Sequence, residues 1–280
     1  MKSAAPALPT RGASPVRGAG GKRWLVPKLR ELIGETEIER YHEPFLGGAS
    51  VFLGLEPFPK AYLGDSNREL IATFRAIRDL PDEVAEQARA YENDESTYYA
   101  VRASTPKGRI GRAARFLYLN HTSFNGIYRV NLNGIYNVPF GNGRDTNIPT
   151  AEQLRDVSAR LKAATLKDQD FADSIDQVKA GDLVFLDPPY TVAHNNNGFV
   201  KYNQRLFSFE DQRRLSRLVG QIKKRRAYYV LANAAHDSIA ELFANGDALI
   251  ETTRRNSIGG NNAVRGSATE YLFTNLAGGS

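Results

Sequence analysis

The apolar run Leu183-Val184-Phe185-Leu186 lies between Gly181-Asp182 and the tetrapeptide Asp187-Pro188-Pro189-Tyr190. A short apolar run bounded in this way by turn-forming residues is typical of a buried parallel strand that stops abruptly. Sheets made wholly of parallel strands are found almost only in α/β proteins. This stretch therefore predicts an open α/β sheet in which the tetrapeptide follows the carboxyl end of a strand.

The tetrapeptide carries groups that suit a binding site. Ligands of open α/β sheets collect at the carboxyl ends of the strands. Because proline has a fixed φ and no N–H, the two prolines leave backbone carbonyl acceptors beside the Asp187 carboxylate without a competing donor. The bend therefore suits a substrate amino group that donates two hydrogen bonds beneath the ring of Tyr190. Taken alone, four such residues fit a strand-ending turn with a surface tyrosine equally well.

Strand-like and helix-like segments alternate on both sides of the middle of the chain. The expected strands are 41–45, 61–65, 164–171, 182–186, 228–231 and an antiparallel pair 248–253 and 270–274, and the expected helices are 22–33, 69–78, 82–91, 150–162, 208–224 and 237–244. Residues 81–162 break the alternation. The predicted organisation is a disordered basic arm at 1–17, a discontinuous catalytic domain at 18–80 and 163–280, and an inserted domain at 81–162 with a hairpin at 125–141.

The net charge of +6 is unevenly distributed along the chain. The first thirty residues carry seven Lys or Arg and no acid, and residues 96–144 form a second acid-free stretch. Its basic residues are Arg102, Lys107, Arg109, Arg112, Arg115, Arg129 and Arg144. Aromatic and amide side chains, which stack on bases and read them, are interleaved with these cations. The stretch therefore favours a nucleic-acid surface over a face that is merely solvated.

Composition and motif content exclude several classes of protein. The chain has no cysteine, which rules out disulfides, thiolate zinc sites, a cysteine nucleophile and the zinc-dependent nucleobase deaminases. It lacks the G-x-x-x-x-G-K-[ST] motif of phosphate-loop ATPases and any apolar run near the ~20 residues of a membrane helix. The histidines, which lie far apart in sequence and are expected to be structural or surface residues, are His42, His121, His194 and His236.

An ordered set of motifs over about residues 18–276 resembles the Dam-like, D12-class DNA adenine-N6 methyltransferases. In chain order the motifs are Gly18-Ala19-Gly20-Gly21-Lys22, Phe45-Leu46-Gly47-Gly48-Ala49-Ser50-Val51-Phe52, Asp65-Ser66-Asn67, the hairpin 125–141, Asp170-Phe171, the tetrapeptide 187–190, and Arg254-Arg255 with Glu270. The resemblance implies S-adenosylmethionine as cofactor and double-stranded DNA as substrate. It also implies a Rossmann-like methyltransferase sheet with an inserted, mainly helical target-recognition domain.

The resemblance and the basic stretch together define the candidate site residues. The catalytic candidates are Asp187, Pro188, Pro189 and Tyr190. The cofactor-binding candidates are Ala19, Gly20, Lys22, Phe45, Gly47, Gly48, Ser50, Asp65, Asp170, Phe171 and Asp187. The DNA-binding candidates are Lys22, Arg102, Arg112, Arg115, Asn125, Arg129, Val130, Asn131 and Asn133. No metal site is expected.

Elementary chemistry agrees with these roles. Glycine at 47 and 48 lets a cofactor approach the backbone without a Cβ in the way, and a carboxylate at the strand tip, Asp65, can accept from both ribose hydroxyls. Asp187 and the Pro188 carbonyl would hold the hydrogens of an adenine amino group, so that its lone pair faces the methyl donor. The base cannot be reached inside a duplex, so it must be flipped out.

The hairpin departs from the pattern of GATC-recognising Dam proteins. Those proteins usually carry an aromatic and then an arginine where this chain has Val130 and Asn133. Arginine is the usual reader of guanine and asparagine of adenine. The departure counts against GATC as the recognition sequence.

Two other functions stay open at this point. A catalytically weak DNA-binding protein on a methylase scaffold is one, although the intact Asp187 and Tyr190 argue against it. Methylation of cytosine N4 or of RNA adenine is the other, because a D-P-P-Y tetrapeptide marks amino methylation in general. The family further implies a monomer in the cytoplasm, nucleoid-associated and encoded by a bacterium or phage, and it is compatible with a cognate restriction endonuclease as partner.

Overall fold

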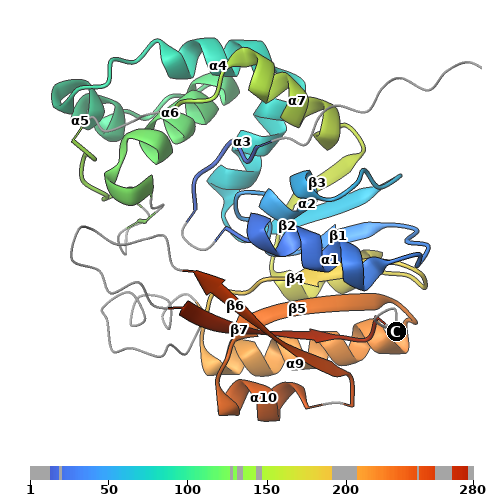
Figure 1. Cartoon of the computed structure of the whole chain (residues 1–280). Coiled ribbons are helices and arrows are strands. Elements are labelled where there is room, and N and C mark those ends of the chain that lie inside the picture. The colour runs from blue at the N-terminus through green and yellow to red at the C-terminus, as the bar shows by residue number, and fades with distance from the viewer. Residues whose placement is uncertain are drawn as a thin grey trace, which may run out of the picture. The chain divides into compact units, whose positions relative to one another are not determined.

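The computed structural model describes residues 13–18, 21–126, 129–130, 135–142, 147–190, 207–244, 246–255 and 267–276 of the 280-residue chain. Within these residues the strands are β1 (Tyr41–Glu43), β2 (Ala61–Asp65), β3 (Ala164–Asp168), β4 (Leu183–Leu186), β5 (Tyr228–Ala234), β6 (Ala248–Arg255) and β7 (Ser267–Thr274). They form a seven-stranded sheet in the order β3-β2-β1-β4-β5-β7-β6 (Figure 1).

The sheet is parallel where β4 pairs with β1 and with β5. Strand β7 is antiparallel to both of its neighbours, β5 and β6. The expected α/β class with a mostly parallel, Rossmann-like sheet is therefore confirmed, and so is the expected antiparallel pair that closes it. The described residues fall into two compact units, one within Met1–Arg30, Leu46–Pro59 and Leu63–Asp168, the other within Glu31–Phe45, Lys60–Tyr62 and Gln169–Ser280.

The second unit has its core between the sheet and one long helix. Helix α9 (Phe209–Lys224) starts at Ser208, which forms a capping box with Asp211, as the sequence predicts. The helix runs along β5 (Figure 1). Its apolar side chains, spaced three or four residues apart as on one helical face, pack into a buried cluster with residues of β4 and β5. The shorter α10 (Asp237–Phe243) contacts α9.

The first unit is mainly helical. It contains α1 (Val26–Ile33) as far as Arg30, and then α2 (Ser50–Gly54), α3 (Arg68–Asp79), α4 (Pro81–Arg89), α5 (Glu95–Ala103), α6 (Arg109–Thr122) and α7 (Ala151–Leu161). Helix α6 is the hub, since it packs against α3, α4 and α5 (Figure 1). The domain boundary expected at residue 80 stays a prediction, because α3 packs closely against α6 and α7. No described helix is long and apolar enough to cross a membrane.

Several strand ends differ from the sequence expectation, and two of these differences have a clear local cause. Strand β3 stops at Asp168 instead of residue 171, because the side chain of Asp170 accepts from the Ala172 N–H at 2.9 Å and caps the 3-10 helix η3 (Phe171–Gln177). Strand β5 continues past residue 231 to Ala234. The polar Asn233, which obscures this extension in the sequence, is buried and donates to Gln212 Oε1 at 2.9 Å.

Residues 14–17 are packed against α6, unlike the disordered arm expected over 1–17. The Arg17 N–H donates to Asn120 Oδ1 at 2.7 Å, and Asn120 Nδ2 donates back to the Arg17 carbonyl at 2.8 Å. His121 Nε2 donates to the carbonyl of Pro15 at 2.9 Å, and Val16 is buried. This segment, called the N-terminal strap below, is thus paired by side chains of α6. Residues 1–12 lie outside the described residues.

The buried His121 predicts a pH dependence of stability. Burial lowers its pKa to about 4 and the charge of Arg17 adds to this effect, while the hydrogen bond from Nε2 to the Pro15 carbonyl opposes it. The buried Nδ1 has no partner among the described residues for a second proton. The unfolded chain takes up this proton near pH 6.5. The free energy of unfolding should therefore fall as the pH drops from about 6.5 to about 4, by up to about 3 kcal/mol from this residue.

Urea unfolding at pH 7 and at pH 4.5 checks this expectation. Replacing His121 with asparagine should shrink the difference between the two pH values, while the same change at the exposed His236 should not. Equal pH dependence in both variants would contradict it.

Candidate active site

The glycine turn and the tip of β2 meet in the first unit. Gly47 has a φ of 47°, in the left-handed region that favours glycine. Its N–H donates to Asp65 Oδ2 at 3.0 Å, and the Asn67 N–H donates to Asp65 Oδ1 at 2.9 Å. Burial raises the pKa of Asp65, and these two hydrogen bonds oppose that effect. The predicted cofactor residues Gly47 and Asp65 are therefore in direct contact.

The second glycine of the turn has a different role from the one expected. A Cβ at Gly48 would lie 2.8 Å from Ser14 Oγ and 2.9 Å from the Val16 carbonyl, so the N-terminal strap occupies that space. A Cβ at Gly47 would meet no described atom within 4 Å, which leaves that side of the turn open. Of the two glycines, only Gly47 thus offers a ligand the open backbone that the sequence predicted for both.

Lys22 and Ser50 are also neighbours. The backbone N–H of Lys22 donates to Ser50 Oγ at 3.2 Å, and Lys22 is buried. Of the same candidate motif, Ala19 and Gly20 lie outside the described residues.

The tetrapeptide follows β4 in the second unit, as predicted. Pro188 is buried, while Asp187, Pro189 and Tyr190 are half-buried. Because β1 and β4 are parallel, with Tyr41 opposite Leu183, their carboxyl ends lie at one edge of the sheet. The tetrapeptide therefore lies at the sheet edge where α/β proteins bind ligands.

A buried carboxylate that sequence reasoning passed over lies at the same edge. Glu43, the last residue of β1, accepts from Tyr41 Oη at 2.8 Å. Burial raises the pKa of Tyr41 well above its usual value, and the negative charges of Glu43 and then Asp187 add to the effect. Asp187 is thus close enough to influence a buried tyrosine. The available sequence signal for Glu43 was an acidic residue within the expected strand 41–45, just ahead of the glycines.

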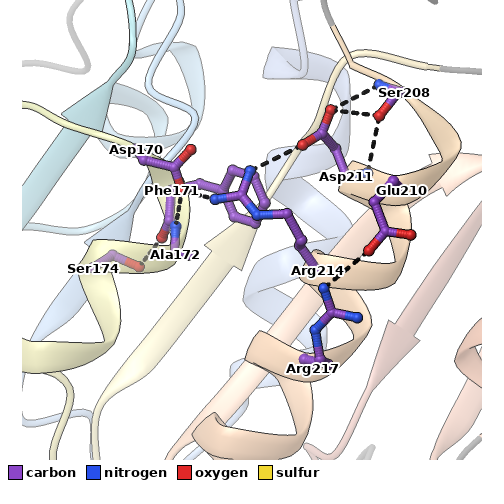
Figure 2. A network of polar contacts seen from close by, with 9 residues as sticks. All are labelled: Asp170, Phe171, Ala172, Ser174, Ser208, Glu210, Asp211, Arg214 and Arg217. Carbon is purple, nitrogen blue, oxygen red and sulfur yellow. Dashed lines mark hydrogen bonds and ion pairs between the residues drawn. The ribbon is translucent and has the colours of Figure 1, made fainter.

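The predicted pair Asp170 and Phe171 lies beyond β3, at the start of η3. The Phe171 ring is buried and stacks on Phe45, with ring centroids 5.1 Å apart, and it also contacts Phe207 at 5.5 Å. Arg214 of α9 donates from Nη2 to Asp170 Oδ1 at 2.6 Å (Figure 2). The structure therefore joins three predicted cofactor residues, 45, 170 and 171, and adds an arginine that the sequence did not single out.

The arginines of the basic stretch have partners inside the first unit. Arg115 donates from Nε to the Val101 carbonyl at 3.0 Å and from Nη2 to the Arg102 carbonyl at 2.6 Å, so it satisfies the end of α5. Arg112 pairs with Glu69 at 2.6 Å. Arg102 donates to the Val138 carbonyl at 3.1 Å. Their expected phosphate contacts stay a prediction, and neutralising them would also remove contacts within the unit.

The hairpin expected at 125–141 is described only in part. Val130 forms a bridge with Tyr136, and Arg129 Nε donates to Asn137 Oδ1 at 2.8 Å. Asn125 has a φ of 58° and is exposed. The candidates Asn131 and Asn133 lie outside the described residues.

The described histidines have structural or surface surroundings, as expected. His42 is buried and bonds Asp182, His121 holds the N-terminal strap, and His236 is exposed. His194 lies outside the described residues. In the described part of the chain, no three His, Asp or Glu side chains cluster as metal ligands would.

Comparison with known proteins gives consistent matches over most of the chain. Residues 19–258 match the model of the D12 class N6 adenine-specific DNA methyltransferase family. The Type II methyltransferase M1.LlaDCHI of Lactococcus lactis subsp. cremoris is 34% identical over 91% of this chain and 93% of its own length. The DNA adenine methylase of Escherichia coli (strain K12) is 30% identical over 92% of this chain and 93% of its own. The Type II methyltransferase M.MjaIII of Methanocaldococcus jannaschii is 30% identical over 78% of this chain and 83% of its own length.

Proposed function

Because the chain belongs to the D12 class of N6 adenine-specific DNA methyltransferases, we propose that residues 187–190 form its catalytic bend and that S-adenosylmethionine is its methyl donor. The observation that carries the proposal is the position of this tetrapeptide at the carboxyl end of β4, beside the end of β1. It combines one carboxylate and two donor-free proline positions with one aromatic ring.

Each unit contains groups that suit part of the cofactor. In the first unit, Asp65 accepts from two backbone N–H groups and has lone pairs left for ribose hydroxyls, next to the open backbone of Gly47. In the second unit, no described residue donates to Asp170 Oδ2, and the backbone N–H of Phe171 has no acceptor among the described residues. A carboxylate acceptor next to a backbone donor matches the amino group and adjacent ring nitrogen of adenine.

The bend would activate a poor nucleophile by position. The lone pair of an adenine amino group is delocalised into the ring, so the group reacts only if its hydrogens are held and its lone pair faces the donor. Asp187 and the Pro188 carbonyl accept these two hydrogens, while Tyr190 stacks on the base. When bound, the cofactor supplies a methyl group on a positive sulfur. As the amino nitrogen gains this methyl, it loses one proton, for which the Asp187 carboxylate is the acceptor at the bend.

Double-stranded DNA is the proposed substrate, with the base flipped at a cost of a few kcal/mol that stacking and phosphate contacts offset. The proposed DNA contacts among the described residues are Lys22, Arg102, Arg112, Arg115, Asn125, Arg129 and Val130. This substrate implies action in the cytoplasm. A restriction endonuclease as cognate partner accords with the Type II methyltransferase names of two relatives.

A product assay tests the proposal directly. Duplex DNA is incubated with the protein and isotope-labelled S-adenosylmethionine, digested to nucleosides and analysed by mass spectrometry. We expect labelled N6-methyladenine in duplex DNA and none in RNA of the same sequence. N4-methylcytosine as the product, a preference for RNA, or DNA binding without methyl transfer would each overturn the proposal and favour one of its alternatives.

A further inference from the structure

We propose that Arg214 is a positioning residue that makes the cofactor site selective for adenine over other purines. It holds one carboxylate oxygen of Asp170, so that the other oxygen faces the amino group of the bound adenine. The inference rests on the proposed cofactor role of Asp170.

The guanidinium of Arg214 bridges two segments of the second unit. Its Nη2 donates to Asp170 Oδ1 at 2.6 Å, ahead of η3, and its Nη1 donates to Asp211 Oδ1 at 2.9 Å in the first turn of α9 (Figure 2). Asp211 is itself held, because its Oδ2 accepts from the N–H and the hydroxyl of Ser208. The contact with Asp211 therefore holds the guanidinium of Arg214 in the orientation in which it contacts Asp170.

The two oxygens of Asp170 have different surroundings. Oδ1 accepts from both Arg214 and the Ala172 N–H, the latter at 2.9 Å. Oδ2 receives no hydrogen bond from any described residue, and 43% of the side chain is exposed. A carboxylate anchored through one oxygen cannot rotate freely, so its second oxygen keeps one direction. That oxygen is an acceptor only, which favours a ligand that carries hydrogens at that position.

The same arginine also fixes the neighbouring ring. Its guanidinium carbon lies 4.8 Å from the centroid of the Phe171 ring, a contact that adds electrostatic attraction to the stacking of Phe171 on Phe45. Holding both Asp170 and the Phe171 ring orients the backbone N–H between them. Arg214 thereby aligns an acceptor and a donor that together distinguish adenine, which has an amino group beside an acceptor nitrogen, from hypoxanthine, in which both are reversed.

An ordinary surface ion pair would have little effect, since exposed pairs contribute little. Arg213, on the same helix, belongs to such a pair. It contacts Glu210 at 3.2 Å and does not reach Asp170 in the structure. The two adjacent arginines therefore form a matched comparison of a positioning role with a plain surface role.

The test measures binding of S-adenosylhomocysteine and S-inosylhomocysteine, which carries hypoxanthine, by calorimetry with the full chain. We expect the wild type to prefer the adenine ligand by about 100-fold, because a site built to hydrogen-bond one group rejects its reversed analogue. Arg214→Gln should reduce this preference about tenfold, mainly because the adenine ligand binds more weakly. The corresponding loss of binding free energy is about 1.4 kcal/mol. Arg214→Lys should fall between the two, because a lysine keeps the charge but not the fork. Arg213→Gln should keep the full preference.

The outcomes separate this inference from the function on which it rests. Asp170→Asn should abolish the preference; if it does not, the proposed cofactor role of Asp170 is wrong. If Asp170→Asn abolishes the preference and Arg214→Gln leaves it intact, Asp170 binds the cofactor but Arg214 does not position it. Equal weakening of both ligands in Arg214→Gln, at an unchanged unfolding midpoint, would likewise overturn the positioning role.

Discussion

Replacing Asp187 with alanine is expected to reduce the rate of methyl transfer by at least about a thousandfold, in line with the loss of a preorganised electrostatic group at a reacting centre. The variant loses one of the two acceptors for the amino hydrogens and the acceptor for the departing proton. Asp187 is half-buried just beyond β4, so its removal leaves the buried strand itself unchanged. Stability and DNA affinity should stay close to those of the wild type.

Single-turnover methylation of duplex DNA, with enzyme in excess, measures this effect apart from product release. Asp187→Asn should retain more activity than the alanine variant, since its amide oxygen still accepts one hydrogen bond. The matched control is Asp173→Asn, because Asp173 is an exposed carboxylate of η3. This variant should react at the wild-type rate. Methyl transfer at a rate close to that of the wild type by Asp187→Ala would remove the carboxylate from the mechanism.

Asp182→Asn is expected to have the converse effect, a loss of stability with little effect on the chemistry of the folded protein. Asp182 is fully buried at the amino end of β4. Its Oδ1 accepts from Arg40 Nε at 2.8 Å, and its Oδ2 accepts from His42 Nε2 and from the Lys179 N–H, each at 2.8 Å. An asparagine would direct an NH₂ group at donors and leave a cation unpaired. Breaking such a buried pair costs about 3–5 kcal/mol.

Denaturant unfolding, with fluorescence and circular dichroism followed together, measures the loss. Asp176→Asn serves as the control because this carboxylate is exposed, and its unfolding midpoint should match that of the wild type. If the free energy of unfolding of Asp182→Asn lies within about 1 kcal/mol of the wild-type value, the hydrogen bonds of Asp182 contribute no more to stability than a surface hydrogen bond does.

The sheet could be predicted from the sequence because each strand carries a local signal. The apolar run 183–186 and its two prolines mark the strand and its end within one residue of the structure. Helix α9 is equally well marked by Ser208 and Asp211 at its start. The family inferred from the order of the motifs is confirmed by the match over residues 19–258. These features depend on neighbours in the chain, which a sequence displays.

The parts that the sequence did not reveal depend on contacts between distant residues. Arg214 and Asp170 are separated by 44 positions, and no spacing rule connects them. The N-terminal strap has the composition of a disordered segment, and its pairing comes from distant side chains such as the amide of Asn120, 103 positions away from Arg17. Helices α5 and α6 were hidden within the basic stretch, where the positive charges suggested a surface and the contacts with carbonyls could not be seen.

The position of β7 has a consequence for how the protein must be made. This last described strand lies between β5 and β6, although it follows both in the chain. While the polypeptide is being synthesised, β6 has no hydrogen-bonding partner in the sheet until residues 267–274 have emerged, and β5 presents an open edge. A product terminated ahead of residue 267 would therefore expose the open edge of β5 and the unpaired β6 to aggregation, in place of a smaller but working enzyme.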